Sequence, residues 1–252
     1  MSHFDVNDLL NSPFEFSFAR DGVFPVGFDR WDLADRDGRT VAHEAARYGH
    51  LPEGFDRWDL ATPGGWTVAH EAAAFGHLPD GFNRWELADN EGWTVAHEAA
   101  KHHYRFPPEF DHWDLRDCHL QTVAHFVASY MPLPPDFDGW EWRDCSNGTV
   151  AHVAAAEGHL PPDFDHWEWR DGDSRTVAHI AAKYRHLPNG FNRWDLATEG
   201  GWTVENEVAY QLVRQLEPKK TPAPKPKSQD DFDVYWDSPA ALGGQPGPDL
   251  EL

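Results

Sequence analysis

Six of the sixteen histidines in this chain recur at intervals of 27 or 28 residues, a pattern that could supply metal ligands or acid–base groups. These column histidines are His43, His70, His97, His125, His152 and His179. A zinc site of the His-Glu-x-x-His type needs a second imidazole four residues after the first, on the same helix face. After the first three column histidines those positions hold Arg47, Ala74 and Lys101. We therefore expect no metal site.

The remaining polar residues do not show the spacing of a catalytic site. The chain has no nucleophile motif, no glycine-rich phosphate loop that follows a strand, and no paired-cysteine site. The pairs Asp111-His112 and Asp165-His166 replace an Asp-Arg pair of other copies, so we interpret them as solvent-facing variants. We predict that the protein is not an enzyme and uses no cofactor.

The column histidines belong to a longer repeat that organises most of the chain. Seven units begin at Phe24, Leu51, Leu78, Phe106, Leu133, Leu160 and Leu187. A unit of about 27 residues is too short to bury its own apolar side chains, so neighbouring units must stack on one another. The period predicts a solenoid over residues 24–216, with its function on an extended surface.

Within a unit, the sequence around the histidine predicts one helix. Thr67 is a suitable N-cap residue, alanine-rich sequence follows it, and Gly76 marks the end about ten residues later. The large residues Phe82, Trp85 and Leu87 come after this stop, in a segment too short for more than a turn or one turn of 3₁₀ helix. We expect them to fill the core.

The pattern Asp-x-x-Gly-x-Thr-x-x-His-x-Ala-Ala-x-x-Gly-His runs from Asp35 to His50 and begins again at Asp89. It resembles the ankyrin repeat, over residues 24 to about 212. The resemblance implies an all-α, ankyrin-like α-solenoid of about seven short helix-turn repeats that binds other proteins. It also implies that the histidine hydrogen-bonds to the preceding threonine and to neighbouring backbone. Valine replaces the usual proline after the threonine, and the unit is shorter than the ~33 residues of ankyrin, so the second helix must be curtailed.

Both ends of the repeat array are degenerate, as the caps of a solenoid are expected to be. Residues 1–23 align as an N-terminal segment with a first helix that lacks the histidine, and Asn206 replaces the histidine in the last unit. Residues 217–229 have the Lys/Pro-rich composition of a linker. Residues 230–252 form an acidic, aromatic tail that we expect to be flexible, to dock on a partner or to fold back. Its motif residues are Phe232, Val234, Tyr235 and Trp236.

The net charge of −22 disfavours direct binding to nucleic acid or to an anionic membrane. The start of the chain lacks the cationic segment of a secretory signal, and no apolar run reaches the ~18 residues of a spanning helix. We expect a cytoplasmic protein whose partner is another protein.

Positions that vary between units are free to contact such a partner. The tip position, just before the threonine, holds Arg39, Trp66, Trp93, Gln121, Gly148, Arg175 and Trp202. The post-histidine position holds Glu44, Glu71, Glu98, Phe126, Val153, Ile180 and Glu207. If the apolar members are exposed, they form a strip with Tyr130 and Tyr184 on the same helix faces; otherwise they are buried by the stacking. The tip tryptophans are either interface anchors or covers for the adjacent turn.

An acidic residue follows the recurring core tryptophan in every unit. This acidic rail consists of Asp32, Asp59, Glu86, Asp114, Glu141, Glu168 and Asp195. The simpler interpretation is a solvated edge balanced by nearby arginines. The alternative is nucleic-acid mimicry, in which the carboxylates replace phosphates and block a basic nucleic-acid-binding protein, as a viral or mobile-element counter-defence protein would. We predict a protein-binding module that uses its helix face and turn tips, with the acidic inhibitor or decoy as the alternative.

Overall fold

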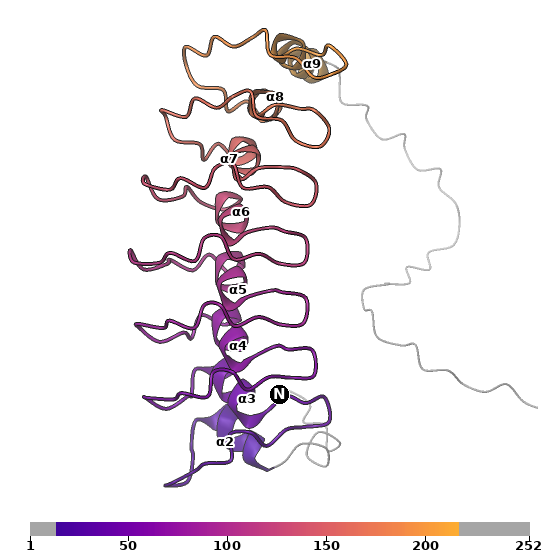
Figure 1. Cartoon of the computed structure of the whole chain (residues 1–252). Helices are drawn as coiled ribbons and strands as arrows, with labels where there is room; N and C mark the ends of the chain where they lie inside the picture. Colours follow the sequence, from indigo (N-terminus) through magenta and orange to yellow (C-terminus); the bar gives the residue numbers. More distant parts are fainter. Residues whose placement is uncertain (1–13, 217–252) are drawn as a thin grey trace, which may run out of the picture. The chain divides into compact units, whose positions relative to one another are not determined.

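The computed structural model describes residues 14–216, which form an all-helical stack of repeats. Each helix packs on the next one along the chain (Figure 1). The helices are α2 (Glu15–Asp21), α3 (Val41–Tyr48), α4 (Val68–Ala74), α5 (Val95–Lys101), α6 (Val123–Ala128), α7 (Val150–Glu157), α8 (Val177–Tyr184) and α9 (Val204–Leu216). The described residues therefore form the predicted all-helical stack, and each of the seven units contributes one helix.

A threonine and a column histidine begin each internal helix. In α4, Thr67 has extended backbone angles, and its hydroxyl accepts a hydrogen bond from the backbone N–H of His70. The His70 ring in turn accepts from the backbone N–H of Thr67, which completes a capping box. A capping box normally uses Glu or Gln at the third helical position, and here histidine takes that role. The internal helices span six to eight residues, shorter than the ten expected.

The turn before each helix from α3 to α9 is closed by a single antiparallel bridge. In the second unit the bridge joins Ala61 and Thr67. In the third unit the carboxylate of Asp89 accepts hydrogen bonds from the backbone N–H groups of Glu91 and Trp93, 2.9 Å each. Asp side chains stabilise turns in this way because they satisfy backbone donors locally. The tip residue of each unit is thus held beside the start of its own helix.

Between successive helices of residues 14–216 the chain forms turns and no second helix. Phe82 donates its backbone N–H to the Pro79 carbonyl, and Leu87 donates to Arg84. The curtailed second helix expected from the sequence is therefore reduced to two consecutive turns. The turns project Phe82 and Trp85, both buried, into the core beside the fully buried valines and alanines of the helices. Aromatic rings from successive units meet edge to face, for example Trp58 on Phe82 at 5.4 Å.

The two end helices differ from the internal ones as the sequence predicts. In α2, Phe16 takes the place of the column histidine and is buried, and no side chain caps the helix. In α9, Asn206 replaces the histidine and still accepts hydrogen bonds from Thr203. The remaining predictions for the ends concern residues 1–13, the linker 217–229 and the tail 230–252, which lie outside the described residues. No helix within residues 14–216 combines the length and apolar character needed to cross a membrane.

Candidate functional site

The column histidines are structural parts of the stack. Nδ1 of His70 lies 2.7 Å from the Thr67 hydroxyl and 3.2 Å from the Thr67 backbone nitrogen. Because Nδ1 accepts the backbone N–H, the ring proton is on Nε2, which donates to the Trp93 carbonyl at 2.9 Å. The resemblance-based expectation for these histidines is confirmed. Within residues 14–216 no group of three or more His, Cys, Asp or Glu side chains could hold a metal ion.

The Nε2 bond joins each unit to the tip of the next. His43, His97, His152 and His179 reach the carbonyl groups of Trp66, Gln121, Arg175 and Trp202 at 2.9–3.2 Å. His125 faces Gly148 in the same way, but its buried Nε2 lies outside hydrogen-bonding geometry. Burial lowers the pKa of each column histidine because the charged imidazolium would lose its hydration. The column is therefore neutral scaffold, and it supplies no exposed acid–base group.

A second histidine ladder escaped the sequence analysis. The histidine that follows the helix contacts a backbone carbonyl of the preceding unit through Nδ1. Since a carbonyl oxygen only accepts, Nδ1 carries the proton here. The pairs are His50–Ala19, His77–Ala46, His159–Ala128 and His186–Ala155, at 2.8–3.2 Å. The recurring His-Leu-Pro sequence was the available signal for this second contact between units.

Tip residues and post-histidine residues, two separate sets in the sequence, lie on one surface that we call the tip face. Nε1 of Trp66 donates to Glu71 at 2.9 Å, and Nε1 of Trp93 donates to Glu98 at 2.8 Å. Trp202 and Glu207 form the same pair at 2.9 Å. Every tip tryptophan is thus paired with a glutamate five residues later, and each pair places an indole across the start of its own helix.

The post-histidine position is mostly buried, which corrects the interpretation of an exposed apolar strip. Glu44, Glu71 and Glu98 are at most 7% exposed, and Ile180 is 8% exposed. Phe126 and Val153 are half-buried. The physical reason is that the neighbouring tips cover this position. Only the predicted tyrosines of the strip, Tyr130 and Tyr184, are largely exposed, at 46% and 47%.

The buried glutamates are neutralised by cations on the same face. Arg39, the tip residue of the first unit, donates to Glu71 at 2.7 Å and lies 3.7 Å from Glu44. Arg20 from α2 donates to Glu44 at 2.6 Å. Glu98 instead receives hydrogen bonds from Trp93 and His102 and a long contact, 3.4 Å, from Lys101. Carboxylates on this face therefore bind guanidinium, ammonium and imidazole groups within the chain itself.

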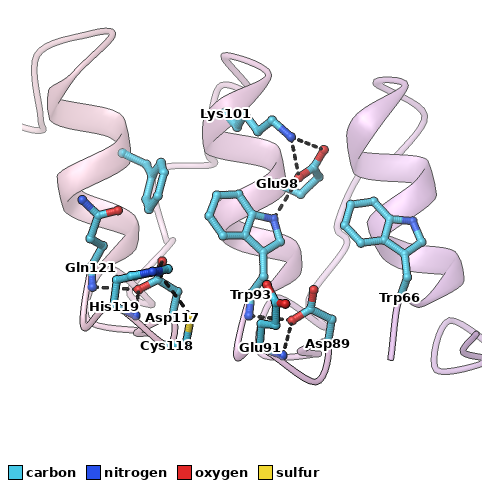
Figure 2. Close-up of a pocket in the computed structure, with 11 residues that line it drawn as sticks. Trp66, Asp89, Glu91, Trp93, Glu98, Lys101, Asp117, Cys118, His119 and Gln121 are labelled. Atoms are coloured by element: carbon cyan, nitrogen blue, oxygen red, sulfur yellow. Dashed lines mark hydrogen bonds and ion pairs between the residues drawn. The ribbon is translucent and has the colours of Figure 1, made fainter. Parts of the chain in front are cut away.

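Two hollows interrupt the tip face. The first, about 420 Å³, lies across α4, α5 and α6 and is lined by Trp66, Trp93 and Phe126 together with four acidic residues and Lys101 (Figure 2). The Trp93 and Phe126 rings meet edge to face at 4.8 Å. The second hollow, about 470 Å³, is lined by Val153, Ile180 and Tyr184. Six of the eight predicted contact residues therefore line one or the other of these two hollows.

Two predicted contact residues lie outside both hollows. Tyr130 packs edge to face on His103, 4.6 Å between ring centres. Trp202 is 44% exposed and packs on Tyr210 of α9 at 6.2 Å. Trp202 is a tip residue and Tyr130 lies after the end of α6, and neither shares a hollow with the other predicted contact residues.

All seven residues of the acidic rail are exposed. Three arginines lie near it: Arg57 is 3.6 Å from Asp32, Arg84 is 3.7 Å from Glu86 and Arg193 is 3.7 Å from Glu168. Ion pairs this exposed contribute at most about 1 kcal/mol, so the rail remains free to meet a partner.

Comparison with protein-family models and with curated protein sequences gave no match.

Proposed function

We propose that this protein is a protein-binding module whose tip face contacts the partner. The observation that carries the proposal is the first hollow, where the half-buried indoles of Trp66 and Trp93 stand at the turn tips of neighbouring units (Figure 2). Aromatic side chains held rigidly in a depression are the usual anchors of protein interfaces. Their hydrogen bonds to buried glutamates fix the indoles before binding, which reduces the entropy lost on association.

The repeat is proposed to be a shortened ankyrin-type unit. The threonine-capped helix, its histidine and the turn that precedes it support this assignment. The two turns in place of a second helix distinguish it from a full-length repeat. Stacked units of this kind present one continuous surface, which suits recognition of an extended partner segment.

The test is capture of partners from a lysate of the source cells, followed by binding measurements with the purified partner. The variant Trp66→Ala/Trp93→Ala removes both indoles of the hollow, and Trp194→Ala removes an exposed tryptophan that is not at a tip. We expect the double variant alone to lose the partner while the circular dichroism of both variants stays native. Equal capture by all three proteins would reject the tip face as the contact surface.

The exposure of the complete acidic rail favours a second candidate function, an acidic decoy for a basic nucleic-acid-binding protein. Under this alternative the partner is held by long-range charge, so affinity falls steeply as salt rises. Binding through the tryptophan hollow is much less sensitive to salt. Neutral variants of the rail, Asp32→Asn, Asp59→Asn and Glu86→Gln together, separate the two functions: a decoy loses its partner, whereas a tip-face module retains it.

A further inference from the structure

We propose that the first hollow of the tip face binds the cationic side chain of an arginine or lysine in the partner. This inference rests on the proposed protein-binding function and specifies the chemistry that the partner presents. It comes from the charge of the hollow, from its aromatic walls, and from the way in which the chain's own cations already occupy neighbouring positions on this face.

Charge complementarity points to a cationic guest. The lining contains Asp89, Glu91, Glu98 and Asp117 against a single lysine, Lys101. The second hollow has a different balance, because Arg175 and Lys183 lie beside its aspartates. Arg175 binds Asp171 and Asp173 at 2.8 and 2.9 Å, so those carboxylates already have a guanidinium partner. The first hollow is therefore the depression of the tip face with the largest excess of negative charge.

The walls of the hollow suit a cation as well. Trp66 and Trp93 present indole rings from the turn tips just before α4 and α5 (Figure 2). A cation within about 6 Å of an indole centroid is attracted by the negative face of the ring. Lys101 already places its ammonium group 5.8 Å from the centroid of Trp93. This lysine is about half exposed, and its contact with a Glu98 carboxylate oxygen is long, 3.4 Å, so the ammonium group is held loosely.

The first unit shows how a guanidinium is accommodated on this face. Its tip residue is Arg39, whose guanidinium lies between the carboxylates of Glu44 and Glu71. In the next two units tryptophan replaces arginine at the tip. The first hollow has no arginine among its lining residues. An arginine from a partner would supply there what Arg39 supplies within the chain, with indole stacking in addition.

The test uses the full-length chain and an acetylated, amidated Gly-Arg-Gly tripeptide as the probe. Its matched control contains citrulline, which has nearly the same shape without the charge. Binding is followed by NMR through the indole N–H signals of Trp66 and Trp93. We expect saturable shifts with the arginine peptide and an affinity for the citrulline peptide about fivefold or more weaker. A lysine tripeptide reports whether a planar guanidinium is preferred.

The proposal predicts that two substitutions change the affinity for the arginine peptide in opposite directions. Trp93→Ala removes a wall and should weaken binding of the arginine peptide about fivefold. Lys101→Gln removes the competing cation from an exposed site and should strengthen binding about two- to threefold. Trp202→Ala, at a tip outside the hollow, should leave the affinity unchanged.

The inference is overturned if the arginine and citrulline peptides bind equally, if neither binds, or if Lys101→Gln weakens binding. Because Lys101 is exposed, this variant tests the idea even if Trp93→Ala fails to fold. A result in which the charge makes no difference, while Trp66→Ala/Trp93→Ala still abolishes capture of a native partner, rejects the cationic ligand and leaves the protein-binding function standing.

Discussion

Nε2 of His70 donates a hydrogen bond to the backbone carbonyl of Trp93, 2.9 Å away, so the side chain that caps one helix also holds the tip of the next repeat. One imidazole therefore performs two tasks, one local and one between units. In the last unit only the local task remains, because no further unit follows α9 within residues 14–216. Asn206 performs it through Oδ1, which accepts from the Thr203 backbone and hydroxyl.

This division of tasks predicts unequal effects of exchanging histidine and asparagine. His70→Asn preserves the cap but removes the Nε2 hydrogen bond to the Trp93 carbonyl, which then keeps only the Asp89 backbone N–H as a donor. This loss should lower the free energy of unfolding by about 1 kcal/mol. The reverse change, Asn206→His, affects a helix start with no following tip and should change stability by less than about 0.5 kcal/mol. Urea unfolding followed by circular dichroism measures both. Comparable losses in the two variants would contradict a role for Nε2 between units.

The column histidines predict acid sensitivity. Burial lowers their pKa in the folded chain, whereas in the unfolded chain they titrate near the usual value of about 6.5. As pH falls through this value the unfolded state binds more protons, so the free energy of unfolding decreases. Above about pH 7.5 both states are neutral at these sites and the dependence should disappear.

Thermal unfolding at a series of pH values measures this effect. The melting temperature should be constant at mildly alkaline pH and should fall on acidification through the histidine range. In His97→Asn one buried imidazole is absent, so the pH dependence should be shallower than in the unchanged chain. A melting temperature that rises on mild acidification would show that repulsion among the acidic residues dominates instead.

A substitution at Gly65 tests how closely the turns of neighbouring units pack on one another. Its φ is +84°, and a Cβ there would meet the backbone nitrogen of Asn90 at 2.6 Å. Gly54 has a similar φ, +78°, and a Cβ added at this residue would have nothing within 4 Å. Gly54→Ala should therefore cost only the left-handed conformation, about 1–2 kcal/mol, while Gly65→Ala should cost clearly more. Chemical unfolding of the two variants gives the comparison, and equal costs would show that the turns can move apart freely.

The pairing of a tip tryptophan with a glutamate predicts that substitutions at these two positions have coupled effects on the free energy of unfolding. In the fourth unit the corresponding residues are Gln121 and Phe126. Phe126→Glu alone introduces a partly buried carboxylate without an indole donor and should cost about 2 kcal/mol. Adding Gln121→Trp supplies the donor found in the second and third units and should recover about half of that loss. A double-mutant cycle by urea unfolding measures the coupling, and strictly additive effects would contradict it.

The sequence predicts the parts of this protein that depend on neighbours along the chain. The repeat length, the capped helix after Thr67 and the degenerate ends follow from short-range hydrogen bonds and from the size of one unit. The structural role of the column histidines also followed, because no second ligand stands at the fourth position after them. The second histidine contact was missed, since Gly76, just before His77, was interpreted only as the end of the helix.

The arrangement of side chains on the tip face depends on contacts that the sequence does not specify. Whether Glu71 or Ile180 is buried depends on how closely the next unit approaches, and Trp66 and Trp93 share a hollow only because α4 and α5 pack directly on one another. The sequence by itself determined the repeating unit and its caps through local backbone chemistry. Only the tertiary structure decided which varying side chains gather into one acidic, aromatic hollow, because those contacts join residues that are distant along the chain and are set by the packing between units.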